Sequence, residues 1–64
     1  MTPTQYRNAL AALDLTQGEA AELLDYSLRT SNAYASGEMT VPLPIAVLLR
    51  LLVAGKIRLE DVRG

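Results

Sequence analysis

The side chains best suited to recognition chemistry lie between residues 27 and 36. Arg29 carries a planar set of donors that can bond two acceptors on a guanine edge, and the amide of Asn32 can pair with an adenine edge. Leu28 or Ala33 could contact a thymine methyl group. At helical spacing Leu28, Asn32 and Ser36 form one row, and Arg29 and Ala33 form the next. The pattern predicts an outward helix face able to read base pairs. The alternative is a solvated face with one charge.

Two short helices joined by a tight turn are predicted to position these residues. The first runs from Thr16 to about Leu24. Thr16 and Glu19 fit a capping box, in which the hydroxyl accepts the backbone N–H three residues on and the carboxylate reaches back. Ala20 and Ala21 are small, so we expect the second helix to approach this one closely and to cross it steeply.

The second helix is predicted from Ser27 to Ser36. Ser27 is a favoured N-cap residue, and Gly37 stands where a left-handed C-terminal cap is expected. Only Asp25 and Tyr26 remain between the helices, and we expect the Tyr26 ring to point inward while its hydroxyl reaches water. A helix, a turn of about three residues and a second helix make a helix-turn-helix, whose second helix is shaped for the major groove of DNA.

This segment resembles the helix-turn-helix of the Cro and lambda-repressor type, the XRE-like regulators of bacteria and their phages. The matching residues are Leu15-Thr16-Gln17, Ala21, Leu24, Ser27, Arg29-Thr30, Tyr34 and Ser36-Gly37. Downstream, Val41-Pro42 and the apolar run 45–54 resemble the family's next helix, so the resemblance covers most of the chain.

The resemblance implies an all-α, four- to five-helix repressor-like domain, with the motif at about residues 16–36, that binds double-stranded DNA. Gln17, at the start of the first motif helix, would donate to a DNA phosphate, where backbone N–H groups also favour anions. The alternative is an ordinary exposed glutamine. The DNA-binding residues implied are Thr16, Gln17, Ser27, Leu28, Arg29, Thr30, Asn32, Ala33 and Ser36.

Three residues depart from the family pattern. Asp25 replaces the usual turn glycine, but aspartate tolerates a left-handed backbone. Ser31 stands where the family buries Val or Ile. Its hydroxyl can bond the carbonyl one turn back, but packing is lost, and we expect Ser31→Val to stabilise the fold if the buried hydroxyl is poorly satisfied. Ala33 stands where a basic or long polar residue is common, which lowers the expected DNA affinity.

Composition excludes several other classes of protein. The chain has 64 residues and neither Cys nor His, so it lacks thiolate metal ligands and the commonest general base. No nucleophile–base pair, phosphate loop or metal cluster is visible, and we expect neither an enzyme nor a cofactor or metal site. The apolar run 45–54 is too short for a membrane span, and the N-terminus lacks the order of a signal peptide. We therefore expect one soluble, cytoplasmic domain.

The net charge of −1 is unusual for a DNA-binding protein. The distribution is uneven: the first 26 residues carry one basic and four acidic side chains, and the rest of the chain carries five basic and three acidic ones. We therefore expect modest non-specific affinity and a shallow dependence on salt. The runner-up function is a helix-turn-helix-derived module that binds a protein, as an antitoxin or adaptor does.

Helices are also predicted outside the motif. Thr2-Pro3-Thr4-Gln5 is a helix start, followed by Tyr6, Leu10 and Leu13 on one face. Pro44 can begin a fourth helix that Gly55 ends, and this helix is apolar on nearly all sides. The tail residues Ile57, Leu59 and Val62 suggest a short extended or helical segment. We expect the fourth helix and this tail to form a homodimer interface, the alternative being a tail that completes a monomeric core.

Overall fold

The computed structural model describes residues 1–63, and these form five helices and no strand. The helices are α1 (Pro3–Ala12), α2 (Gln17–Leu24), α3 (Leu28–Ser36), α4 (Leu43–Val53) and α5 (Leu59–Arg63). The all-α prediction is confirmed for this part of the chain. α4 begins one residue earlier than predicted, with Pro44 in its first turn, where the missing N–H removes no helical bond.

The first three helices are set by side-chain caps that the sequence predicts. The N–H of Gln5 donates to Thr2 Oγ1 over 3.1 Å, and the Thr2 N–H donates to Gln5 Oε1 over 2.8 Å. Thr16 and Glu19 form the same reciprocal pair at 3.0 and 2.9 Å. The Ser27 hydroxyl accepts the N–H of Thr30 over 3.1 Å. Each cap satisfies backbone donors that a helix start leaves open.

Two left-handed residues end α2 and α3. Asp25 has φ 62° and ψ 47°, so the aspartate adopts the backbone that glycine usually supplies in this turn. Gly37 has φ 86°, and a Cβ at this position would lie 3.0 Å from Pro3 Cγ. Gly37 is therefore required for both its backbone and the close approach of α1.

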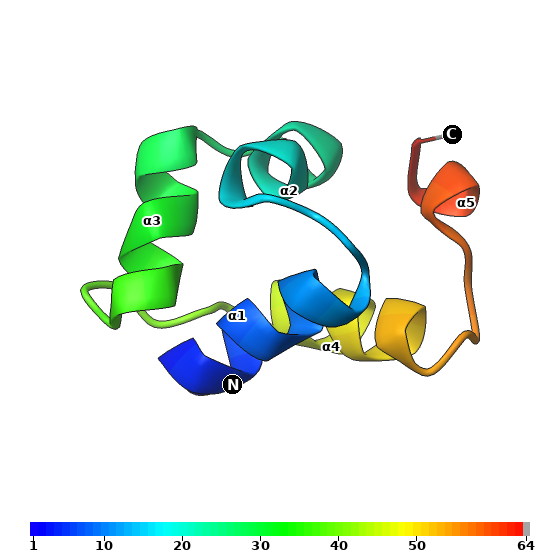
Figure 1. Ribbon diagram of the computed structural model, residues 1–64, viewed down its shortest axis with the longest axis horizontal. Helices are drawn as coiled ribbons and strands as arrows, with labels where there is room; N and C mark the ends of the chain where they lie inside the picture. Colours follow the sequence, from blue (N-terminus) through cyan, green and yellow to red (C-terminus); the bar gives the residue numbers. More distant parts are fainter. Residues whose placement is uncertain (64) are drawn as a thin grey trace.

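The core lies where α1 and α4 meet the α2–α3 pair (Figure 1). Tyr6 and Leu49 are its largest fully buried apolar side chains, and Leu10 is nearly fully buried. Of the predicted face of α1, Tyr6 and Leu10 are buried and Leu13 is partly buried. Small alanines complete the core, which lets these short helices pack closely.

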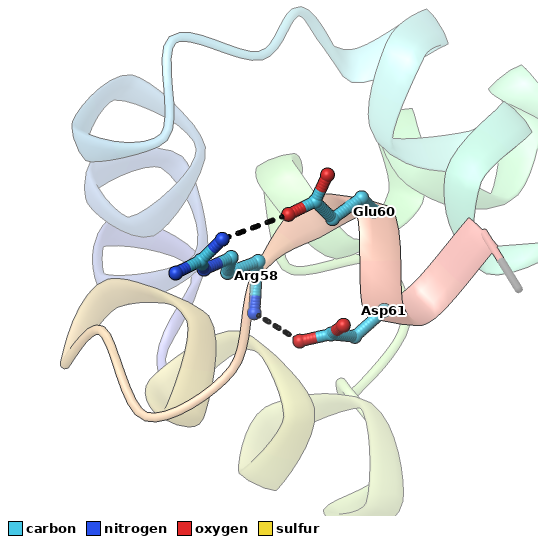
Figure 2. A network of polar contacts seen from close by, with 3 residues as sticks. All are labelled: Arg58, Glu60 and Asp61. Atoms are coloured by element: carbon cyan, nitrogen blue, oxygen red, sulfur yellow. Dashed lines mark hydrogen bonds and ion pairs between the residues drawn. The ribbon is translucent and has the colours of Figure 1, made fainter.

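The tail forms a helix, α5, and lies beside α2 (Figure 1). Its start is fixed by a carboxylate: the backbone N–H of Arg58 donates to Asp61 Oδ2 over 3.0 Å, which is half of a capping box. Figure 2 shows this bond together with the Arg58–Glu60 ion pair of 3.2 Å, whose two side chains are both exposed to solvent. Because α5 packs on α2, it leaves the outer side of α4 open.

α4 is apolar on two sides, and only one of them is covered. Ala46, Leu49 and Leu52 face the core. Leu43 is 71% exposed, and Val47 and Leu51, which follow it at steps of four residues, are also exposed. None of the described helices is long and apolar enough to span a membrane.

Candidate functional site

The α2–α3 pair carries the predicted site residues. The helices are joined by a three-residue turn, in which the N–H of Tyr26 donates to the Ala21 carbonyl over 2.9 Å. Ala20 and Ala21 are buried, as predicted from their size. A Cβ placed on Gly18 would lie 3.8 Å from Leu28 Cδ1, so the start of α2 lies beside the start of α3.

α3 presents four side chains to solvent, which we call the α3 outer face: Leu28, Arg29, Asn32 and Ser36. Leu28 is 54% exposed although it is apolar. Neither Arg29 nor Asn32 has a side-chain hydrogen bond or ion pair to a described residue, so their donors are free for a ligand. The prediction that these residues share one outward face is confirmed.

The placement of Ala33 on this face is wrong. Ala33 is only 6% exposed. At 100° per residue it lies beyond Arg29, toward the partly buried Thr30, at the edge of the inner face. After α3 the chain turns back, and the N–H groups of Gly37 and Met39 both donate to the Ala33 carbonyl. The Ala33 methyl group is therefore not part of the α3 outer face.

The other predicted contact residues are partly engaged in capping. The Thr16 hydroxyl accepts the N–H of Glu19. Ser27 Oγ donates to Thr30 Oγ1 over 3.0 Å, so these two hydroxyls bond to one another. Gln17, by contrast, is half-buried and has no side-chain hydrogen-bond partner among the described residues. Its amide is the free donor at the start of α2.

Arg7 is a residue of this region that the sequence reasoning missed. Its guanidinium donates to the Ala35 carbonyl near the end of α3 and to Thr4 Oγ1. Together with Thr16 and Gln17 it lines a hollow between α1 and the start of α2. The signal available in the sequence is that Arg7 is the only basic residue in the acidic first 26 residues.

Behind the α3 outer face lies a buried chain of hydroxyl groups. Tyr6 Oη is 2.6 Å from Ser31 Oγ and 2.8 Å from Tyr26 Oη. The Tyr34 ring meets the rings of Tyr6 and Tyr26 edge-on, with centroids 5.6 and 5.3 Å apart. We call these four residues the tyrosine–serine network; it ties α1 and the turn to α3.

This network corrects two expectations. Ser31 is fully buried, as expected, but its hydroxyl bonds Tyr6 and not the carbonyl one turn back. The Tyr26 hydroxyl bonds Tyr6, where water was expected. Burial, and then the hydrogen bond to Tyr6, raises the pKa of Tyr26 above its ordinary value, which keeps this phenol protonated as a hydrogen-bonding group.

The tyrosine–serine network could have been suspected from composition. All three aromatic residues of the chain are tyrosines, and none is Phe or Trp. A buried phenol needs a polar partner. Tyr6 lies on the predicted buried face of α1, so its hydroxyl had to meet another polar group there.

Comparison with known proteins adds no identification, because no protein-family model, curated protein or solved structure matches this chain.

Proposed function

We propose that this chain is a helix-turn-helix regulator that binds operator DNA in the cytoplasm and represses transcription. The observation that carries the proposal is that the α3 outer face presents the free donors of Arg29 and Asn32 beside the start of α2. α3 would enter the major groove, where Arg29 would read guanine and Asn32 adenine. Leu28 would contact a thymine methyl group.

Phosphate contacts would orient α3 without reading sequence. The unpaired amide of Gln17 and the open backbone N–H groups at the start of α2 suit a phosphate oxygen. Arg7 lines the same hollow and supplies a positive charge. With so few basic groups on this side, the dependence of affinity on salt should be shallow.

Selection of bound sequences from a random DNA pool tests this function. We expect enrichment of one motif with two half-sites, each containing the guanine and adenine that Arg29 and Asn32 would read. Affinity for the selected sequence should exceed that for scrambled DNA of the same length and base composition. Equal affinity for both, or no enrichment, would contradict a role in reading operator DNA.

We further propose that the regulator binds as a homodimer through α4. The exposed row of Leu43, Val47 and Leu51 supports this assembly, because monomeric proteins rarely leave such an apolar face open. The tail contributes less, since Ile57, Leu59 and Val62 are each partly buried within one copy. In the dimer the two copies of α3 should lie roughly 34–36 Å apart, one turn of DNA.

A charge in the exposed row tests the dimer. Leu51→Glu should abolish operator binding while the circular dichroism spectrum stays helical, because Leu51 is exposed in one copy. Sedimentation should show a dimer for the parent chain and a monomer for the variant. The matched control is Lys56→Glu, an exposed change after α4 that should leave the dimer intact. A parent chain that stays monomeric at high concentration and on DNA contradicts this assembly.

The second candidate is a module that binds a protein. It is favoured by the α3 outer face itself, where the exposed Leu28 accompanies a single charge, Arg29. In this case the random-pool selection fails, and Leu28→Ala changes no DNA affinity.

A further inference from the structure

A groove of about 480 Å³ lies between α1 and α4, away from the residues proposed to contact DNA. One wall is a single face of α1, with Gln5, Asn8, Ala9 and Ala12 at steps of three and four residues. The opposite wall is one face of α4, with Arg50, Val53 and Ala54. The volume falls in the range of roughly 300–1,000 Å³ that small-molecule sites occupy.

The lining of this groove is aliphatic except at a few points. Val53 is an exposed large apolar side chain, and the lining includes three alanines, Ala9, Ala12 and Ala54. Arg50 carries the charged side chain of the lining, which also includes Met1. Arg50 forms no ion pair or side-chain hydrogen bond with any residue that the structure describes. The guanidinium of Arg50 is therefore available to an outside anion such as a carboxylate.

We infer that the groove binds an amphipathic monocarboxylate, an alkyl chain with one carboxylate head. The chain would lie along Ala9, Ala12 and Val53 and remove their apolar surface from water. The carboxylate would accept two N–H bonds from the planar guanidinium of Arg50, a geometry that a carboxylate matches. The exposed amide of Asn8 in the facing wall offers a further donor.

The composition of the groove argues against a polyanion as its ligand. A nucleic acid needs several positive charges along its backbone, and Arg50 is the single charged side chain among the residues of this lining. The site is also independent of the proposed DNA interface, which lies on α2 and α3. Its test therefore needs no DNA, and its failure would leave the proposed function unchanged.

The experiment is a titration of the isotope-labelled full chain with sodium octanoate below its critical micelle concentration, followed by backbone amide chemical shifts. We expect saturable shifts concentrated at Ala9, Ala12 and residues 50–54. Octanamide, which has the same chain and no charge, should bind more weakly. Equal binding of octanoate and octanamide overturns the proposal, as do shifts that fail to saturate in both the parent chain and Leu51→Glu.

Variants of exposed residues separate the two parts of the site. Arg50→Gln should weaken octanoate binding roughly two- to fivefold, the size of an exposed ion pair, and should leave octanamide binding unchanged. Lys56→Gln removes a charge outside the groove and should change neither. An unchanged octanoate affinity in Arg50→Gln contradicts the assignment.

Filling the groove tests its apolar part. Ala12→Trp should abolish octanoate binding, because Ala12 is exposed and lines the groove. The matched control is Ala11→Trp, which places the same ring one residue away, on the hollow that Arg7 lines. Repeating the titration with Leu51→Glu removes the second copy proposed to pack on α4. Binding that survives Ala12→Trp, or is absent in both the parent chain and Leu51→Glu, overturns the proposal.

Discussion

α3 and α4 have similar lengths but bury their inner faces by different means. The inner face of α3 carries Ser31 and Tyr34, and it is held by hydroxyl bonds to Tyr6 and by ring edges. The inner face of α4 carries only aliphatic groups, with Leu49 fully buried. Hydrogen bonds are directional, whereas apolar burial is not. The network therefore fixes the orientation of α3, and α4 supplies much of the apolar burial.

The outer faces of α3 and α4 also differ in polarity. α3 presents hydrogen-bonding groups, of which Arg29 and Asn32 are free. α4 presents the apolar row of Leu43, Val47 and Leu51. Polar edges of base pairs match the first kind of surface, and the apolar surface of another protein copy matches the second. For the proposed DNA binding, rigid support of α3 by the tyrosine–serine network would favour base contacts, because these depend on the position of the helix in the groove.

The largest expected effect comes from the inner face of α4. Leu49→Ala should lower the free energy of unfolding by about 2–5 kcal/mol, since it leaves a cavity in a core this small. Urea denaturation of the DNA-free chain measures the change. Leu43→Ala, on the exposed side of the same helix, should stay within about 0.5 kcal/mol of the parent at concentrations where the chain is monomeric. Equal losses for both would mean that the two faces of α4 are not distinct.

The next largest change in stability is expected on the inner face of α3, and its sign is opposite to the one expected from the sequence. Ser31→Val should destabilise the chain by about 1 kcal/mol, because the buried Tyr6 hydroxyl loses one of its two partners, the Ser31 Oγ at 2.6 Å, and keeps only Tyr26. A double-mutant cycle with Tyr6→Phe isolates the pair, and a coupling of at least about 0.5 kcal/mol is expected. A higher melting temperature for Ser31→Val would show that packing at this position outweighs the hydrogen bond.

This reversal illustrates what the sequence could and could not predict. Helix limits and turns were predictable because their causes are local: Thr16 meets Glu19 three residues away, and Gly37 ends α3 by its own backbone. The partner of Ser31 lies 25 residues away on α1. A periodic pattern shows that both residues face inward, but not that their hydroxyls meet.

The same distinction applies to the candidate site and to the tail. Exposure of Arg29 and Asn32 follows from helical spacing, and the structure agrees. Ala33 lies at the edge of that face, where helical spacing alone does not predict that it is buried. The tail prediction left its conformation open, and its packing on α2 depends on tertiary contacts that no local pattern encodes.

The outer face of α3 provides a prediction on binding of similar size. Arg29→Ala should weaken operator binding by about 1–3 kcal/mol and relax the preference at one base position, because Arg29 is the charged group of that face. Gln17→Ala is the comparison, and should weaken binding to all sequences alike, as a phosphate contact does. Fluorescence anisotropy with selected and scrambled duplexes measures both. Equal losses on both duplexes for Arg29→Ala would assign it to a phosphate.

The smallest expected effect is a pH dependence of stability, which tests Tyr26, the member of the tyrosine–serine network in the turn between α2 and α3. Because burial raises the pKa of Tyr26 in the folded chain, the folded state holds the phenolic proton more tightly than the unfolded state. This contribution to stability is complete below the unfolded pKa of about 10 and is lost as the pH rises above it. Loss of one proton on unfolding lowers the free energy of unfolding by at most about 1.4 kcal/mol per pH unit, and solvent around the half-buried ring reduces this slope. Urea denaturation between about pH 9 and 11 should show the unfolding free energy of the parent falling faster than that of Tyr26→Phe. Parallel curves would mean that Tyr26 ionises as freely in the folded chain as in the unfolded one. The contacts that hold the inner face of α3 would then lose no more stability at alkaline pH than the aliphatic contacts of α4.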